Sequence, residues 1–522
     1  GGHPEGKIPP GASAGGEKIP PGGPYPAGKI PQGAHFDQKL PAGDQPPLPK
    51  IPAVGGGCRC VGKVPVPFEP VDVMAQATQY INFILGHQAP SGWLGPDDPT
   101  SRADGTQYWP PSNVLLALAS FAEGSAEAGD LKQAEQATSA ILSHVLEMRS
   151  RLGSVPLSSW AQQRWMDLAW VVEWLLDRSP AHPAVTKNTS ELLHTLALLH
   201  AQGYDREAYF EQPGPLGASG NSHNVNVAQG LKSTAVLFRF NASYTFDGRT
   251  PRELALRRMA RLDREVGLPS GMYNGDEFLP SPPTRSPSRG IELCGVAEAI
   301  WSYACLFAAH GDASFAERAE RIAFNALPAT WASPTGGDMW AHQYLQAVNE
   351  ISAVKSNPHL WQRDGPDAET YGLEPNYGCC TANFQQGWPK FASHLFFTSP
   401  TGAVVVAAWA PASATIRPPT KAQPPPAQRA RREAPAGPEI DGAAPAAPEI
   451  DGEAPAGRAA GGGPEASPKI DRARPVAPEI DGGREAAPDA GGGGGEAGAS
   501  IQIEVETDYP FGDTAVVVVT VP

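Results

Sequence analysis

Three of the six cysteines stand where a thiolate can do chemistry. Cys294, in RGIELCGV, and the adjacent Cys379 and Cys380, in PNYGCCTANF, each come at the expected start of a helix. The positive end of a helix dipole lowers the pKa of a thiol and stabilises its thiolate. Glu292 lies two residues before Cys294, and zinc takes four ligands of the Cys, His and Glu kind. These four side chains are candidate metal ligands; a strained disulfide within the Cys-Cys pair, or chance, is the alternative.

Glu277 is the candidate proton donor. It lies in SGMYNGDEFLPSP, a Gly- and Pro-rich loop after a helix, where a glycosidase keeps its general acid. The alternative is that Asp276 and Glu277 are solvated loop charges. His223, in GNSHNVNVAQGLK, begins another expected helix, where a lone His is more often a cap or a packed residue than a ligand. Cys305 lies among apolar residues inside a helix and is expected to be inert core.

The elements that must position these residues are helices. Ten segments show the three- and four-residue apolar spacing of helices, with Ser112 or Asn113 as an expected N-cap and Pro389 as an interruption of the last segment. The segments are 73–88, 112–125, 131–153, 160–178, 190–203, 225–240, 250–267, 294–311, 313–330 and 381–397. Because no fixed repeat period accompanies them, a solenoid is disfavoured. We expect a mainly α protein whose catalytic domain is an (α/α)6 toroid spanning 67–400.

Composition separates this domain from its surroundings. Gly and Pro supply 57 residues each, concentrated in a Lys-Ile-Pro repeat over 1–66 and a PEIDG repeat over 419–499. We expect both stretches to be disordered, because they lack the apolar residues of a core. Residues 401–418 and 500–522 alternate as strands do, which predicts a partial β-sandwich interrupted by the 419–499 insertion.

Charge and hydropathy exclude some partners. The net charge is −15 and no basic face stands out, so nucleic acid is not an expected partner. No apolar run has the length of a membrane span. The chain begins with Gly and shows no signal-peptide pattern. Two sequons, at Asn188 and Asn241, give weak support for secretion.

Taken together, these segments resemble glycoside hydrolase family 127, the β-L-arabinofuranosidases. The resemblance covers residues 67–420 or so, in order, through SHNVNVAQGLK, GMYNGDEF, PSRGIELC, MWAHQYLQAVNEI and NYGCCTANFQQGWPKF. It implies an (α/α)6 barrel followed by β-sandwich modules. It also implies one Zn²⁺ bound by a Glu and three Cys, which are here Glu292, Cys294, Cys379 and Cys380.

The resemblance also implies catalytic roles. Cys379 corresponds to the nucleophile and Glu277 to the general acid/base, with His223, His342 and Tyr344 as substrate-binding residues. A thiolate would attack the anomeric carbon while Glu277 protonates the leaving oxygen. Water activated by Glu277 would then release the sugar with retained configuration.

The expected function is therefore a retaining glycosidase that releases terminal β-L-arabinofuranose from wall glycans or hydroxyproline-rich glycoproteins, outside the cell or in the cell wall. One alternative is another helical-toroid glycosidase or lyase that uses Glu277 with a second carboxylate. Another is a non-catalytic wall-associated binding or structural protein, in which the Pro-rich repeats carry out the function. The chain departs from the family in its N-terminal tail, its interrupted sandwich and its truncated C-terminal strands.

Overall fold

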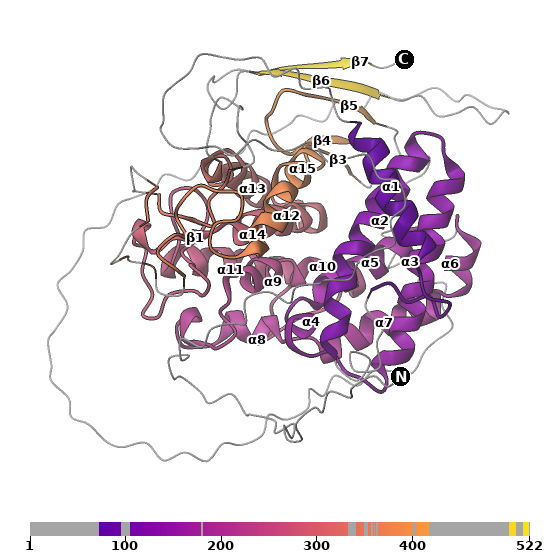
Figure 1. The fold of residues 1–522 in the computed structure, drawn as a ribbon, viewed down its shortest axis with the longest axis horizontal. Coiled ribbons are helices and arrows are strands. Elements are labelled where there is room, and N and C mark those ends of the chain that lie inside the picture. The colour runs from indigo at the N-terminus through magenta and orange to yellow at the C-terminus, as the bar shows by residue number, and fades with distance from the viewer. Residues whose placement is uncertain are drawn as a thin grey trace, which may run out of the picture.

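Helices dominate the protein (Figure 1). The computed structural model describes residues 72–95, 105–178, 181–331, 341–348, 353–355, 359, 361, 364–399, 403–416, 501–507 and 515–520. Within these ranges the chain is mainly α, with a small sheet region toward its C-terminal end. This confirms the expected class. The tail 1–66 and the insertion 419–499 lie outside the described residues.

Each of the ten predicted segments contains helix. The helices are α1 (Val73–Gly86), α2 (Trp109–Glu127), α3 (Leu131–Leu152), α4 (Ser159–Gln163), α5 (Trp165–Leu176), α6 (Pro183–Lys187), α7 (Thr189–Gln202), α8 (Arg206–Glu211), α9 (Asn224–Gly230), α10 (Ser233–Phe240), α11 (Pro251–Glu265), α12 (Leu293–His310), α13 (Ala313–Asn325), α14 (Gly378–Asn383) and α15 (Gly387–Ala392).

The boundaries differ from the sequence prediction at α2. Neither Ser112 nor Asn113 is its N-cap, because the helix begins at Trp109 and two prolines occupy its first turn. Proline is tolerated there, since the first N–H groups of a helix have no partner within the helix. The interruption near Pro389 is confirmed: a 3₁₀ turn (Phe384–Gln386) separates α14 from α15.

Two buried apolar clusters form the core. The first joins α1 to α7 with part of α10, and the second joins α8 to α15. In Figure 1 the indigo and magenta helices of the first cluster lie on the right, and the pink and orange helices of the second lie on the left. Helix α12 is central to the second cluster, where it packs against α9, α13 and α15.

Helix α12 has the length and apolar composition of a membrane-spanning helix, although most of it lies in the core of the protein. Of the helices in the described ranges, it alone is long and apolar enough to cross a membrane by length and composition, and 72% of its apolar window is buried inside the protein. A core helix meets the same criterion, so this is weak evidence for a membrane span.

The strands form three small antiparallel sheets. They are β1 (Ile291–Glu292) with β2 (Leu345–Gln346), β3 (Phe396–Thr398) with β4 (Val404–Val406), and β5 (Ala412–Ile416), β6 (Ile501–Thr507) and β7 (Ala515–Thr520) in that order. Strand β5 pairs with β6 in a register that sets Ile416 opposite Ile501. The two strand-like segments on either side of residues 417–500 therefore belong to one sheet.

Candidate metal centre and active site

The β1–β2 pairing fixes Glu292 at the start of α12. The Glu292 N–H donates to the Gly275 carbonyl at 3.0 Å, and the Leu293 N–H donates to the Tyr344 carbonyl at 3.0 Å. Gly290 directly precedes β1 at a φ of 94°, in the left-handed region that favours glycine. Backbone bonds thus bring α12, the loop with Glu277 and the segment with Tyr344 to one place.

Asn224 ties a third segment to this place. Its N–H donates to the Glu277 carbonyl at 2.8 Å, and its Nδ2 donates to the Gly275 carbonyl at 3.0 Å. Gly295, in the first turn of α12, leaves room for the Asn224 amide, since a Cβ at this position would lie 2.5 Å from Nδ2. His223, which precedes Asn224 as the N-cap of α9, is therefore carried to the same site.

The four predicted metal ligands converge. One ligand atom from each of Glu292, Cys294, Cys379 and Cys380 lies within 4.8 Å of the others, and Cys380 Sγ lies 3.3 Å from Cys294 Sγ. Cys379 is exposed, whereas the other three are buried. The cluster could therefore hold a metal ion, with Cys379 as its accessible member.

Electrostatics in the cluster favour a bound cation. Burial, and then the charges of Glu277 and Cys379, raise the pKa of the Glu292 carboxyl well above its ordinary value. Hydrogen bonds from Cys294 and Cys380 hold the pKa of Cys379 well below its ordinary value. Glu292 Oε2 is buried without a hydrogen-bond partner among the described residues. A cation would relieve this repulsion and satisfy that oxygen.

Glu277 lies beside this cluster with two predicted partners. Its Oε2 is 3.1 Å from His223 Nε2, and its Oε1 contacts the Tyr344 hydroxyl. The same hydroxyl lies 3.5 Å from Cys379 Sγ. Burial, and then the charges of Glu292 and Glu277, raise the pKa of Tyr344 far above its ordinary value. Tyr344 therefore stays a neutral hydroxyl that links Glu277 to Cys379.

His342 has a different environment from the other predicted site residues. Its side chain is fully buried, and its ring stacks on Phe384 with centroids 4.5 Å apart. Its Nε2 lies 3.2 Å from Thr381 Oγ1. These contacts support α14, which carries Cys379 and Cys380, and the structure does not bring His342 to the cavity wall described next.

A cavity of about 360 Å³ opens onto the thiols between the two core clusters. Its wall combines the predicted His223, Glu292, Cys294 and Cys379 with residues that the sequence did not indicate as part of a site. The latter are Trp109, Asn113, Trp160, Arg164, Val225, Gln229, Glu298, Ala382, Asn383 and Gln386.

Asp364 is a further acid near the site that the sequence did not indicate. Burial, and then the charges of Glu277 and Asp276, raise its pKa to about 9. Asn376 Nδ2 donates to its Oδ1 at 2.9 Å. No motif surrounds Asp364, and only the folded chain reveals that the charge of Glu277 acts on it.

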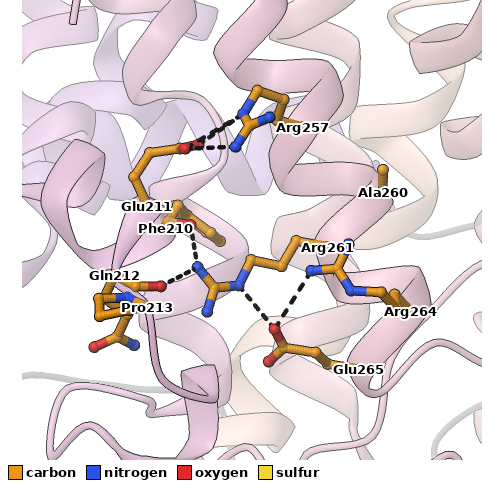
Figure 2. A pocket seen from close by; sticks show the side chains of 9 residues that line it. All are labelled: Phe210, Glu211, Gln212, Pro213, Arg257, Ala260, Arg261, Arg264 and Glu265. Atoms are coloured by element: carbon orange, nitrogen blue, oxygen red, sulfur yellow. Dashed lines mark hydrogen bonds and ion pairs between the residues drawn. The ribbon is translucent and has the colours of Figure 1, made fainter. Parts of the chain in front are cut away.

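A second cavity, of about 330 Å³, lies at α8 and α11 and has no comparable chemistry (Figure 2). Its charged side chains already have partners. Arg257 Nη2 lies 2.8 Å from Glu211, and Arg261 Nε lies 2.8 Å from Glu265. Arg261 Nη1 also donates to the carbonyls of Phe210 and Gln212. These ion pairs and backbone bonds hold α8 against α11.

Comparisons of the chain with models of known protein families and with curated proteins give no match. An accessible thiol lies next to buried thiols and a buried carboxyl, and a second carboxyl is held beside it by His223 and Tyr344. This arrangement supplies a candidate nucleophile, Cys379, on the cavity wall and a candidate proton donor, Glu277, which contacts the wall residue His223.

We expect the purified full-length protein to contain about one metal ion per chain, and Cys294→Ser to lose most of it. A hydroxyl replaces a thiolate there, and metal affinity depends on the complete ligand set. Elemental analysis after dialysis measures this. Cys305→Ser is the matched control, because Cys305 lies on the same helix but outside the cluster. Equal metal content in both variants would exclude the four-residue site.

Proposed function

We propose that this protein is a retaining glycoside hydrolase that releases terminal β-L-arabinofuranose from wall glycans or hydroxyproline-rich glycoproteins, and that its helices form an (α/α)6 toroid. One observation carries the proposal. The accessible thiol of Cys379 and the carboxyl of Glu277 both contact the Tyr344 hydroxyl. A nucleophile and a proton donor on either side of one group are what a double-displacement glycosidase needs.

Zinc is the proposed metal. Its usual ligands are thiolate, imidazole and carboxylate in a four-coordinate site, and the four converging donors are three cysteines and one glutamate. Glu292, Cys294, Cys379 and Cys380 would hold it. When bound, the ion supplies positive charge that keeps these thiols deprotonated at neutral pH.

The first half of the proposed reaction transfers the sugar to Cys379. The Cys379 sulfur attacks the anomeric carbon and forms a C–S bond as the C–O bond to the leaving group breaks. Glu277 gives its proton to the leaving oxygen, which departs as an alcohol. His223 and Tyr344 orient Glu277 for this transfer, because each contacts a different carboxyl oxygen.

The second half returns the enzyme to its starting state. Glu277, now a carboxylate, takes a proton from a water molecule whose oxygen attacks the anomeric carbon. The C–S bond breaks, and its electron pair returns to the Cys379 thiolate. Two inversions at one carbon give net retention of configuration.

A carboxylate pair is the second candidate mechanism. One oxygen of Glu277 lies within 4.8 Å of one oxygen of Glu292, and retaining carboxylate pairs are about 5–5.5 Å apart. Glu292, however, is only 1% exposed, whereas Cys379 is exposed. Access to the sugar therefore favours the thiol as nucleophile.

Hydrolysis of a 4-nitrophenyl β-L-arabinofuranoside by the full-length protein tests the function. We expect turnover of this substrate in preference to the α-L-arabinofuranoside and the β-D-xyloside. Because retention is expected, proton NMR should detect the β-anomer of arabinose first. No turnover by metal-loaded protein, or release of the inverted anomer, would refute the proposal.

A further inference from the structure

Arg164 is an unusual group in the cavity wall. It lies between α4 and α5, and its guanidinium lies over the rings of Trp109 and Trp160, at 4.9 Å and 4.8 Å from their centroids. Its Nε donates to Asn226 Oδ1 at 2.9 Å. Among the described residues, none accepts a hydrogen bond from Nη1 or Nη2. The contacts with Trp109, Trp160 and Asn226 thus fix the positions of Nη1 and Nη2, and the N–H groups of these two nitrogens have no acceptor among the described residues.

Gln229 supplies an unused acceptor in the same wall. Its side chain is 5% exposed, and its Nε2 donates to Asp167 Oδ2 at 2.9 Å. Asp167 is itself fixed by Lys232, whose Nζ lies 2.6 Å from Oδ1. With the amide nitrogen committed to Asp167, Gln229 Oε1 is left without a hydrogen-bond partner in the described part of the chain. A buried polar atom without a partner at a cavity wall indicates a missing ligand group.

These observations define the chemistry of that ligand. We propose that Arg164, Gln229, Trp109 and Trp160 form a second sugar-binding subsite, which holds a neutral sugar on the leaving-group side of the cleaved bond. The proposal rests on the proposed glycosidase function. Sugar hydroxyls both donate and accept, so they satisfy Arg164 and Gln229 together. The indole rings offer apolar surface to the C–H groups of a sugar ring.

Charge argues against an acidic sugar at this subsite. A uronate carboxylate could pair with Arg164, but it would face Gln229 Oε1, an acceptor, and Glu298, whose Oε1 and Oε2 lie 3.4 Å from Lys390 and 3.9 Å from Lys232. The positive charges of these lysines are already matched by Glu298 and Asp167. Arg164 still has unused N–H donors, but its positive charge already acts on Glu298 and Asp167. The wall therefore has no further positive charge to offset a carboxylate near the thiolates.

Geometry places this subsite on the leaving-group side. The ring of Trp160 meets the ring of His223 edge to face at 5.0 Å between centroids. His223 in turn contacts Glu277, which gives its proton to the leaving oxygen in the proposed reaction. A sugar that contacts both Trp160 and Arg164 is therefore separated from the proton donor, Glu277, only by His223.

Three substrates test this subsite, namely 4-nitrophenyl β-L-arabinofuranoside, a disaccharide of β-L-arabinofuranose linked to a neutral pentose, and one linked to a hexuronic acid. For Arg164→Met we expect kcat/KM to fall about 10- to 100-fold more on the neutral disaccharide than on the nitrophenyl substrate, because only the leaving group of the disaccharide carries hydroxyls that can bind the guanidinium. Arg164→Lys should restore only part of this loss, since it keeps the charge and not the planar fork.

Arg178→Met is the matched control. Arg178 also covers an indole, that of Trp174 at 3.2 Å, but it does not line the cavity. This variant should leave the ratio of the two kcat/KM values unchanged, and circular dichroism and metal content check that the Arg164 variants are folded. Equal losses of Arg164→Met on both substrates, or a wild-type preference for the uronate, would overturn the subsite.

The outcome for the subsite is separable from the outcome for the function. If the wild type hydrolyses none of the three compounds, the proposed glycosidase function fails. Titration of indole fluorescence with the neutral disaccharide then tests the subsite by binding alone. Weaker binding by Arg164→Met than by the wild type supports the subsite, and equal or undetectable binding by both overturns it.

Discussion

Cys379→Ser is expected to lower kcat by about 10⁴-fold or more, even on a nitrophenyl substrate with a good leaving group, as losses of catalytic nucleophiles generally do. A serine hydroxyl is far less ionised than this thiol, whose pKa is held well below its ordinary value by hydrogen bonds from Cys294 and Cys380. Steady-state kinetics with the full-length protein measures the loss. Normal turnover by this variant would remove the thiol from the mechanism.

Cys380→Ser is the matched control for this result. Both substitutions take one sulfur from the candidate metal site, but Cys380 is fully buried and cannot reach a sugar. When each substitution is combined with Glu277→Gln, which prevents removal of the sugar, we therefore expect Cys380→Ser to form a covalent adduct on Cys379, more slowly than Glu277→Gln alone, and Cys379→Ser to form none. If neither double variant forms an adduct while Glu277→Gln alone does, loss of the metal accounts for both results. An adduct in Cys379→Ser would refute the nucleophile assignment.

The helices could be predicted from the sequence because they follow from local spacing. Apolar residues at three- and four-residue steps locate α3, α11 and α12 within a few residues of their observed bounds. Breaks inside the predicted segments were harder to foresee. The segment 160–178 is divided into α4 and α5 at Arg164. The guanidinium of Arg164 lies over the ring of Trp109, which belongs to α2. A contact between residues far apart in the chain does not change the spacing of apolar residues, so the sequence does not predict this break.

Only the site residues that belong to recognisable motifs could be predicted from the sequence. The Glu-x-Cys and Cys-Cys motifs predicted four side chains that the fold does bring together, although spacing alone could not show that residues about 85 positions apart would meet. The same reasoning grouped His342 with Tyr344 from their shared segment, yet the fold turns them to different neighbours. Trp160 and Gln229 belong to no motif, and they join the cavity because the two core clusters meet there.

Glu277→Gln is expected to trap the covalent intermediate. The amide cannot donate a proton to the leaving oxygen, but nitrophenolate needs little protonation, so transfer of the sugar to Cys379 should still occur. Removal of the sugar needs a general base, which the amide cannot supply. The adduct should therefore accumulate, and mass spectrometry after digestion should show one added pentose on the peptide that contains Cys379.

Azide provides the decisive control for this variant. As an anion it needs no general base, so it can attack the anomeric carbon directly, displace the Cys379 thiolate and release a glycosyl azide of retained configuration. Added azide should thus restore turnover of the nitrophenyl substrate by Glu277→Gln and abolish the adduct. An added pentose on the peptide with Glu292 instead would favour the carboxylate pair, because Glu292 is the acid whose oxygen lies within 4.8 Å of Glu277. If azide gives the inverted product, no covalent intermediate precedes its attack, and Cys379 then serves only the metal.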